Sequence, residues 1–390
     1  MSRYHAYLKK AVAILEMYKG QEPFSVFCKQ QFSLDRRMGS TDRKWVRHYC
    51  YCFFRMGNAL RALPIEERMV TGLFLCGKKE DPLLALLRPA WNQRITSSLT
   101  EKIAFLSEAL PGLVQAIFPY EDLLSKPLAG TNWPLSLLEQ PLLFIRLRPG
   151  KEQQVIEALQ AQSILFEQVG ERSLALPATT SLSSWPGLNR DFVIQDLSSQ
   201  RIGSMLSALP AAATKKIWDC CAASGGKSIL TVDTLGAVSL TVSDKRKTIL
   251  QQLHRRFVQA EITDYSAIEI DLTQPVPSSF SDTFSLIWAD VPCSGSGTWS
   301  RTPEQLYFFQ DASLNGFTKL QRDILQTALS RLQPGGYLLY STCSVFAQEN
   351  EEQVAWLEKE RGLRCVQQQL FDGSTQQADT LFAALLQRLR

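Results

Sequence analysis

The chain has 390 residues, with 42 Lys and Arg against 38 Asp and Glu, which gives a net charge of +4. Hydrophobic residues make up 45% and charged residues 21%, values typical of globular proteins, so a wholly disordered chain and a coiled coil are excluded. No apolar run reaches the ~18 residues that span a bilayer, and AVAIL, after Lys9 and Lys10, is too short for a secretory signal. We therefore expect a cytoplasmic protein without membrane contact.

The numbers and spacing of the cysteines and histidines indicate which kinds of site to expect. Nine cysteines without an exported context predict free thiols rather than a disulfide framework. The three histidines, His5, His48 and His254, have no metal-ligand spacing from one another or from a cysteine. We expect neither a metal centre nor a histidine-based catalytic triad.

Charge is concentrated at the amino-terminal end. Residues 1–60 hold eleven Lys and Arg against four Asp and Glu, whereas the other 330 residues are slightly acidic. A basic end on a nearly neutral body suits a polyanionic partner, although charge alone fits a solvated surface equally well.

The first predicted domain, residues 1–127, is helical. It has few glycines and apolar residues at helical spacing, such as Leu8, Val12 and Leu15. Within RRMGSTDRKWVR (36–47), Ser40 or Thr41 is expected as the N-cap of a basic helix.

Residues 128–200 predict a small α/β module. LLFIRLR (142–148) has a strand pattern, Pro149-Gly150 breaks it, and KEQQVIEALQAQ (151–162) is typical of a helix. Two short strands are expected at 164–169 and 173–178.

The third predicted domain, residues 201–390, alternates strands and helices. Strands are expected at 217–219, 238–244, 268–270, 284–289 and 337–343, with helices between them, among them one over 245–260. Such alternation predicts an α/β fold with a doubly wound, Rossmann-like parallel sheet.

Four successive strands of this domain end in an aspartate: Asp219, Asp244, Asp271 and Asp290. One such residue is commonplace as a helix N-cap, but four in order indicate a ligand site, because ligands bind at the carboxyl edge of a parallel sheet. The turn CAASGGKS (221–228) lacks the first glycine of a phosphate-binding P-loop, and GxGxxG is absent. A Gly-rich turn with Asp244 placed for ribose hydroxyls favours a nucleoside cofactor without a pyrophosphate, and S-adenosylmethionine fits.

Two cysteines differ from the rest. Cys293 in DVPCSGSG (290–297) and Cys343 in YSTCS (340–344) follow successive strands among small polar residues, where a thiolate can be exposed and activated. Six other cysteines fit the usual role of a small buried hydrophobe: Cys28, Cys50, Cys52, Cys76, Cys220 and Cys365. From the residues alone, either Cys293 or Cys343 could be a nucleophile.

These motifs resemble those of the S-adenosylmethionine-dependent RNA cytosine-C5 methyltransferases of the Sun/Fmu type. The resemblance rests on DCCAASGGKS, SDKR, DVPCSGSG and YSTCS, with IQDLSSQ, RTPE and ENEEQV in the same order, and covers residues 140–360. The helical region with STDRKWVRHY is similar to the NusB-like RNA-binding domain of bacterial small-subunit rRNA methyltransferases. The 128–200 module resembles their RNA-recognition-type insert. One departure is Ser224, which stands where the family usually has proline, so we expect a looser turn.

The resemblance implies roles for the site residues. Cys343 would be the nucleophile that attacks cytosine C6, Cys293 would assist release of the product, and Asp290 would bind the cytosine edge. Asp244 is expected on the cofactor's ribose and Asp271 near its adenine. The cofactor's amino-acid end would lie against the loop Cys221, Ala222, Ala223, Ser224, Gly225, Gly226 and Lys227. Lys227 is expected to pair with a carboxylate, either the cofactor's or that of Asp290.

The expected partner is RNA, most simply small-subunit rRNA, bound by a monomer. Candidate phosphate contacts are Arg146 and Arg148 in the module and Arg36, Arg37, Arg43, Lys44 and Arg47 in the helical region. Two alternatives stay open: the same reaction on tRNA, and a ribosome-assembly factor that binds RNA without catalysis. Retention of both cysteines favours a catalyst.

Overall fold

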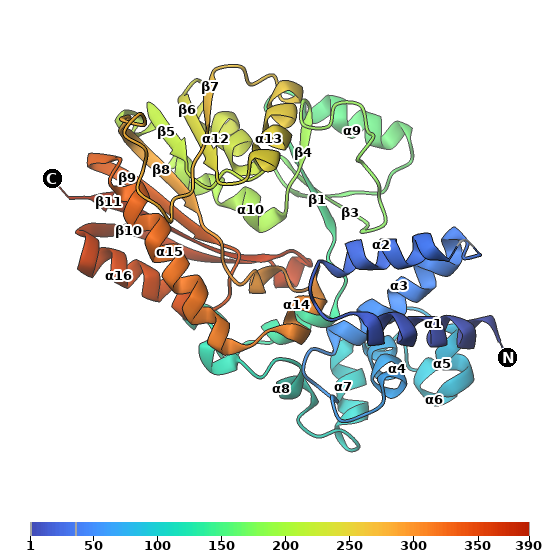
Figure 1. Ribbon diagram of the computed structural model, residues 1–390. Coiled ribbons are helices and arrows are strands. Elements are labelled where there is room, and N and C mark those ends of the chain that lie inside the picture. Colours follow the sequence, from blue (N-terminus) through green and yellow to red (C-terminus); the bar gives the residue numbers. More distant parts are fainter. Residues whose placement is uncertain (1, 36, 390) are drawn as a thin grey trace. The chain divides into compact units, whose positions relative to one another are not determined.

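A computed structural model describes residues 2–35 and 37–389 of the protein (Figure 1). The chain forms two compact units. The first comprises Met1–Leu124, Leu128–Gln140 and Thr298–Asp311, and the second comprises Ser125–Pro127, Pro141–Gly297 and Ala312–Arg390. The segment Thr298–Asp311, which lies inside the third domain predicted from the sequence, is thus part of the first unit.

The first unit is helical, as the composition of residues 1–127 predicts. Its helices are α1 (Arg3–Met17), α2 (Phe24–Leu34), α3 (Ser40–Arg55), α4 (Ile65–Cys76), α5 (Pro82–Leu87), α6 (Pro89–Asn92), α7 (Leu99–Ser107), α8 (Leu113–Ile117) and α14 (Pro303–Phe308), with short 3-10 turns at Glu121–Leu123 and Trp133–Leu138. None of the helices in the described part of the chain is both long and apolar enough to cross a bilayer. The buried core of this unit is rich in aromatic side chains, among them Phe24, Phe54 and Phe74.

The start of α3 differs from the sequence prediction. Gly39, rather than Ser40 or Thr41, is the N-cap residue, and the carboxylate of Asp42 accepts a hydrogen bond from the Gly39 backbone N–H at 2.8 Å. Asp42 takes over the first-turn stabilisation that a hydroxyl N-cap would give, so the helix begins one residue earlier.

The second unit contains a four-stranded antiparallel sheet formed by the predicted α/β module. It has the strand order β2-β3-β1-β4 and one helix, with elements β1 (Leu143–Leu147), α9 (Glu152–Ala161), β2 (Glu167–Gly170), β3 (Ser173–Leu176) and β4 (Phe192–Ile194). The apolar face of α9, with Val155 and Leu159, packs on Ile145 and Leu147 of β1. No break in contacts separates this module from the residues that follow it.

The rest of the second unit is built around a seven-stranded sheet of order β10-β11-β9-β8-β5-β6-β7. Its strands are β5 (Lys216–Asp219), β6 (Ser239–Asp244), β7 (Tyr265–Glu269), β8 (Phe284–Asp290), β9 (Leu332–Thr342), β10 (Leu363–Asp372) and β11 (Thr380–Arg388). Its helices are α10 (Leu197–Arg201), α11 (Gly203–Ser207), α12 (Gly226–Leu235), α13 (Lys247–Gln259), α15 (Leu314–Leu329) and α16 (Glu351–Arg361), with short 3-10 turns at Ala211–Thr214, Ser296–Thr298 and Ala347–Glu349. Strands β5 to β9 are parallel, which confirms the doubly wound α/β prediction.

Helices cover both faces of this sheet (Figure 1). On one face α12 and α13 pack on side chains such as Trp288 and Leu339, and on the other α15 and α16 pack on Ile287 and Leu338. Successive strand residues point to opposite faces, so a strand covered on both sides reads as a continuous apolar run. FSLIWA (284–289) is such a run.

The carboxyl-terminal strands are not part of the parallel pattern. β11 lies between β9 and β10 and is antiparallel to both. Thr380–Arg388, within the segment DTLFAALLQRLR, therefore forms a strand inside the sheet, where the sequence pattern predicted none. Apolar and polar residues do not alternate in this segment, so the sequence does not distinguish a strand from a helix there.

Candidate active site

Three of the four predicted aspartates end strands at one edge of the seven-stranded sheet. Asp219 ends β5, Asp244 ends β6, Asp290 ends β8, and Asp271 lies two residues beyond the end of β7. The chain runs outward from β5 to β6 and β7 and then returns to β8 on the other side of β5. The carboxyl edge between β5 and β8 is thus a topological switch point, where open α/β sheets bind ligands.

The loop between β5 and α12 is tightly turned. Ala223 and Gly225 have φ angles of 46° and 83°, both in the left-handed region. A Cβ on Gly225 would lie 2.7 Å from Cε1 of Phe257 and 3.0 Å from Cγ of Leu253. Glycine at this position lets helix α13 pack directly against the loop.

Ser224 does not leave this turn loose. Nη1 of Arg256, on α13, donates to the Ser224 carbonyl oxygen at 3.0 Å and to its hydroxyl at 2.9 Å, while Nε donates to Asn189 at 3.1 Å. The Arg256 guanidinium thus holds a turn that, in the sequence analysis, was expected to be looser because it lacks a proline.

A cavity of about 120 Å³ lies at the ends of β6 and β7. Its lining combines the polar residues Asp244 and Asp271 with the apolar side chains of Leu320 and Ile324. Asp244 is buried, and its carboxylate accepts from the exposed guanidinium of Arg246 at 3.0 and 3.1 Å. Carboxylates beside apolar side chains are suited to a ribose with a flat base, the environment predicted for Asp244 and Asp271.

Asp219 is a buried hydrogen-bond acceptor at the carboxyl edge of the seven-stranded sheet. Its Oδ2 accepts from the Ser228 hydroxyl at 2.5 Å, and its Oδ1 is buried without a hydrogen-bond partner. Burial raises the pKa of Asp219 to about 7, against the smaller opposing effect of the Ser228 hydrogen bond. A buried carboxylate with a free oxygen fits a ligand that brings a hydrogen-bond donor or an ammonium group to the loop.

Lys227 pairs with Asp290, one of the two partners expected for it. Nζ lies 2.6 Å from Oδ2 of Asp290, and the Ser341 hydroxyl donates to Oδ1 at 2.8 Å. Trp288 donates from Nε1 to the Ser341 hydroxyl at 3.0 Å and so fixes its direction. Burial alone would lower the pKa of Lys227, but the charge of Asp290 and the hydrogen bond to it raise it overall, so the lysine stays an ammonium.

The two motif cysteines meet at the same edge. Their sulfur atoms are 3.3 Å apart, and both residues are only partly exposed. A hydrogen bond to Cys343 and then burial raise the pKa of the Cys293 thiol well above its usual range. Cys293 is therefore a protonated thiol that can donate to the sulfur of Cys343.

The two module arginines have partners inside the fold. Arg146 and Arg148 both bind the carboxylate of Asp233 on α12, at 2.5 and 2.8 Å, and all three side chains are largely buried. Arg148 also donates to the carbonyl oxygen of Ala260 at 2.6 Å. Burial and pairing favour a role in joining β1 to α12 and α13 over the predicted phosphate contact.

Four of the candidate phosphate-binding residues in the helical unit are described. Lys44 is exposed, Arg37 is almost fully exposed beside Asp35, and Arg47 is exposed with its guanidinium 5.7 Å from the centre of the Phe32 ring. Arg43 is half-buried, and its Nε donates to the carbonyl oxygen of Met38 at 3.1 Å. Arg36 lies outside the described residues.

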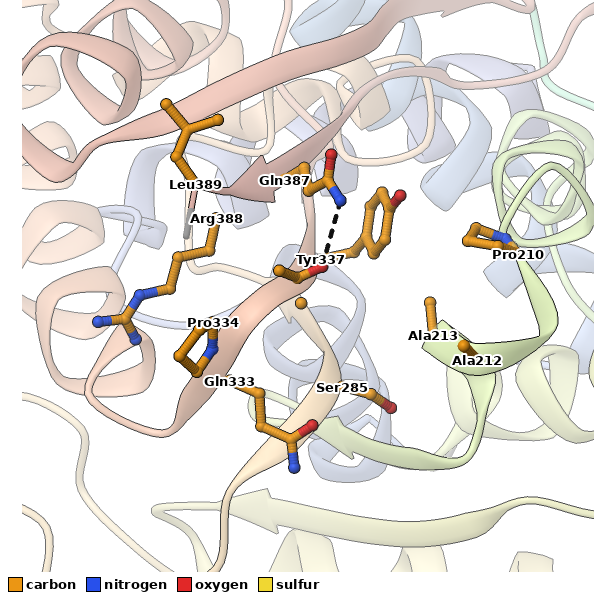
Figure 2. Close-up of a pocket in the computed structure, with 12 residues that line it drawn as sticks. Pro210, Ala212, Ala213, Ser285, Gln333, Pro334, Tyr337, Gln387, Arg388 and Leu389 are labelled. Atoms are coloured by element: carbon orange, nitrogen blue, oxygen red, sulfur yellow. Dashed lines mark hydrogen bonds between the residues drawn. The ribbon is translucent and has the colours of Figure 1, made fainter.

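A larger cavity, of about 480 Å³, lies at the opposite edge of the sheet (Figure 2). Ser285 contributes from the start of β8, Gln333 from the start of β9, and Gln387 from the end of antiparallel β11. It is remote from the aspartates and thiols because parallel strands carry those at their other ends.

Several residues that organise the site were not predicted from the sequence. Ser341 supports Asp290, and Asp233 supports the two arginines. Arg256 holds the loop, and Glu349 binds the cysteine motifs. Ser341 lies in the motif YSTCS and Glu349 in ENEEQV, but neither pattern says what these side chains contact.

Residues 206–386 match the family model for the 16S rRNA methyltransferase RsmB/F. The resemblance to RNA methyltransferases that the motifs predicted is thereby confirmed over these residues, and the parallel strands β5 to β9 confirm the predicted Rossmann-like sheet.

Proteins that are similar in sequence agree with this match. "Ribosomal RNA small subunit methyltransferase B" of Vibrio cholerae is 29% identical over 60% of this chain and 58% of its own, and that of Xylella fastidiosa is 28% identical over 58% and 54%. A mouse "tRNA (cytosine(72)-C(5))-methyltransferase NSUN6" is 34% identical over 42% of this chain and 36% of its own. The chain spans little more than half the length of the bacterial relatives it matches.

Solved structures show the same fold. The crystal structure of PH0851 has a TM-score of 0.69 at 16% identity and covers 99% of this chain and 98% of its own. NSun6 from Pyrococcus horikoshii, solved with SFG, has a TM-score of 0.60 at 16% identity and covers 70% of this chain and 97% of its own.

Proposed function

We propose that this protein transfers a methyl group from S-adenosylmethionine to C5 of a cytosine in RNA, through a covalent bond between Cys343 and cytosine C6. The observation that carries the proposal is the pair of thiols, 3.3 Å apart, at the same sheet edge as the Lys227–Asp290 ion pair. A methyltransferase that acts on a heteroatom nucleophile has no need of two neighbouring thiols.

The residues present fit S-adenosylmethionine. Asp244 and Asp271, with the apolar cavity beside them, would hold the ribose and adenine, and the free oxygen of Asp219 would accept from the amino group. When bound, the cofactor supplies an electrophilic methyl group. S-adenosylmethionine is the cofactor of this methyltransferase family, and SFG, an analogue of it, is bound in the Pyrococcus NSun6 structure.

The two thiols have different roles in the proposed reaction. The thiolate of Cys343 would add to C6, which makes C5 electron-rich enough to take the methyl group. Loss of the C5 proton to water and departure of the Cys343 thiolate then restore the ring. Cys293, held as a neutral thiol beside Cys343, can give its proton to the departing Cys343 sulfur. Asp290 would bind the cytosine edge, and Lys227 would stabilise charge near it.

Small-subunit rRNA is the substrate that we propose. The bacterial relatives are named as small-subunit rRNA methyltransferases, and the helical unit presents the exposed cations Arg37, Lys44 and Arg47. The target base must leave any stacked helix to reach the thiols, at a cost of a few kcal/mol, so unpaired or partly assembled RNA is favoured. The name of the mouse relative keeps tRNA as a second candidate.

One experiment separates these substrates. Labelled S-adenosylmethionine is incubated with the protein and unmodified small-subunit rRNA, large-subunit rRNA or bulk tRNA, and 5-methylcytosine is measured in each. We expect label in small-subunit rRNA alone. Label in tRNA would replace the substrate but keep the chemistry. No label in any RNA, with cofactor binding intact, would contradict the proposal and favour a non-catalytic assembly factor.

A further inference from the structure

Glu349 lies between the two cysteine motifs. It ends the short turn Ala347–Glu349 before α16 and is fully buried. Its Oε1 accepts from the Ser294 backbone N–H and from Nε2 of Gln321, both at 2.9 Å. Its Oε2 accepts from the hydroxyls of Ser294, at 2.5 Å, and Ser344, at 2.6 Å. One carboxylate thus binds both motifs.

Each serine in this arrangement follows a cysteine. Ser294 comes directly after Cys293, and Ser344 directly after Cys343. Because adjacent residues move together, holding both serines on one carboxylate fixes the separation of the two thiols. The backbone of Glu349 is itself anchored, since the Tyr340 hydroxyl donates to its carbonyl oxygen at 2.6 Å.

The four donors also determine the charge of Glu349. All four groups donate hydrogen bonds to the side chain, which is the pattern that an ionised carboxylate requires. None of these partners carries a positive charge, so backbone, amide and hydroxyl dipoles alone stabilise the anion. The site therefore contains a buried negative charge that its hydrogen bonds do not neutralise.

This charge acts on Cys293. The pKa of the Cys293 thiol is raised first by the hydrogen bond to Cys343, then by burial and by the charges of Cys343 and Glu349. The raised pKa of Lys227 is due mainly to Asp290, and the charge of Cys343 adds to it. Buried Tyr340 also lies near Glu349 and Cys293, and its own raised pKa keeps it neutral.

We propose that Glu349 is a positioning residue that holds the thiols of Cys293 and Cys343 together and keeps Cys293 as the proton donor of the pair. Its kinetic consequence rests on the proposed function, whereas its effect on the Cys293 thiol does not. Glu349 contacts neither thiol through a hydrogen bond, so it acts through the two loops and through its charge.

The test compares Glu349→Gln with Glu352→Gln, the same change at an exposed position on α16. Glutamine keeps the shape of the side chain, and its amide can donate to the two serine hydroxyls, so the variant removes mainly the charge. The rate of iodoacetamide alkylation of Cys293 is measured against pH by mass spectrometry of its peptide in the full chain. We expect the midpoint to fall by about one pH unit in Glu349→Gln and to stay unchanged in Glu352→Gln.

Kinetics supply the second readout. In Glu349→Gln, kcat for methyl transfer is expected to fall about 10- to 100-fold while KM for S-adenosylmethionine stays constant, since the cofactor cavity is untouched. The double variant Ser294→Ala/Ser344→Ala keeps the charge and removes both hydroxyl links. It is expected to lower kcat, and to lower the alkylation midpoint as well, because Cys293 loses its hydrogen bond to Cys343 when the thiols move apart. It replaces Glu349→Gln if that variant fails to fold.

The outcomes separate the inference from the proposed function. An alkylation midpoint in Glu349→Gln equal to that of the wild type would overturn the role of the charge. A wild-type kcat in the double serine variant would overturn the positioning of the thiols. If the wild-type protein methylates no RNA, the proposed function fails, yet the alkylation midpoint still decides what Glu349 does to Cys293.

Discussion

The sulfur atoms of Cys293 and Cys343 lie in contact, yet their surroundings differ. After the hydrogen bond to Cys343 and burial, the charges of Cys343 and Glu349 add to the raised pKa of the Cys293 thiol. Cys293 is thus favoured as the thiol of the pair that keeps its proton. The proposal that Cys343 is the nucleophile, a choice that the sequence pattern alone left open, is tested by variants of both residues.

The roles of the thiols predict opposite behaviour in two variants. Cys343→Ala is expected to abolish methyl transfer, because no covalent bond to C6 can form. Cys293→Ala is expected to accumulate a protein–RNA adduct that survives a denaturing gel, because product release loses its proton donor. Both are measured by gel shift with labelled RNA. An adduct in Cys343→Ala that is absent from Cys293→Ala would reverse the assignment.

Asp219 predicts a pH dependence of stability. Its pKa is about 7 in the folded protein and ~3.9 when unfolded, so the folded state favours the protonated form. Its stabilising contribution is complete below about pH 4 and is lost as the pH rises through 7. Asp219→Asn, which can still accept from Ser228, is expected to be more stable than the wild type at pH 8 and similar at pH 4. The free energies of unfolding of both proteins, without cofactor, are measured in urea at pH 4 and pH 8. A difference between the two proteins that is the same at both pH values would contradict the prediction.

At the level of elements, buried ion pairs join the small sheet to the large one. Arg146 in β1 and Arg148 just after it bind Asp233 on α12, which explains why the module and the seven-stranded sheet share one compact unit. The sequence presented the same arginines as surface cations, because a pattern of charges along one segment does not show which residues of a distant helix face it.

Removing the shared carboxylate tests this connection. Asp233→Asn leaves two buried guanidinium groups without a counter-charge and is expected to lower the free energy of unfolding by about 3–5 kcal/mol. Asp282→Asn, in an exposed pair with Lys216, is the control and is expected to cost less than about 1 kcal/mol. If urea unfolding shows the same loss of unfolding free energy in both variants, the ion pairs at Asp233 do not stabilise the fold.

At the scale of the whole molecule, the two units are interleaved along the chain. Thr298–Asp311 follows the Cys293 motif directly but packs within the helical unit. There Trp299 and Leu306 are buried, and the carboxylate of Glu304 accepts from the backbone N–H of Phe24 at 3.1 Å. The segment after the Cys293 motif therefore depends on the helical unit for its fold.

This dependence predicts the behaviour of a truncated protein. A fragment that begins at Pro141 would expose Trp299 and Leu306, and we expect it to aggregate or to melt at a lower temperature than the full chain. Co-expression of residues 1–140 is expected to restore solubility, since the segment then regains its partners. Size-exclusion chromatography and thermal melts check both. A stable, monomeric fragment with native thiol reactivity would show that the helical unit is dispensable.

The sequence by itself determined the order of strands and helices from residue 216 to 343, the aspartates at the strand ends, and the motif cysteines. These are local patterns, because strand alternation, turns and short motifs depend on neighbouring residues. The tertiary structure alone decided that β11 inserts antiparallel beside β9, that Thr298–Asp311 joins the helical unit, that Arg146 and Arg148 are buried, and that Glu349 binds both cysteine motifs. Each of these depends on contacts between residues far apart in the chain, which no local pattern records.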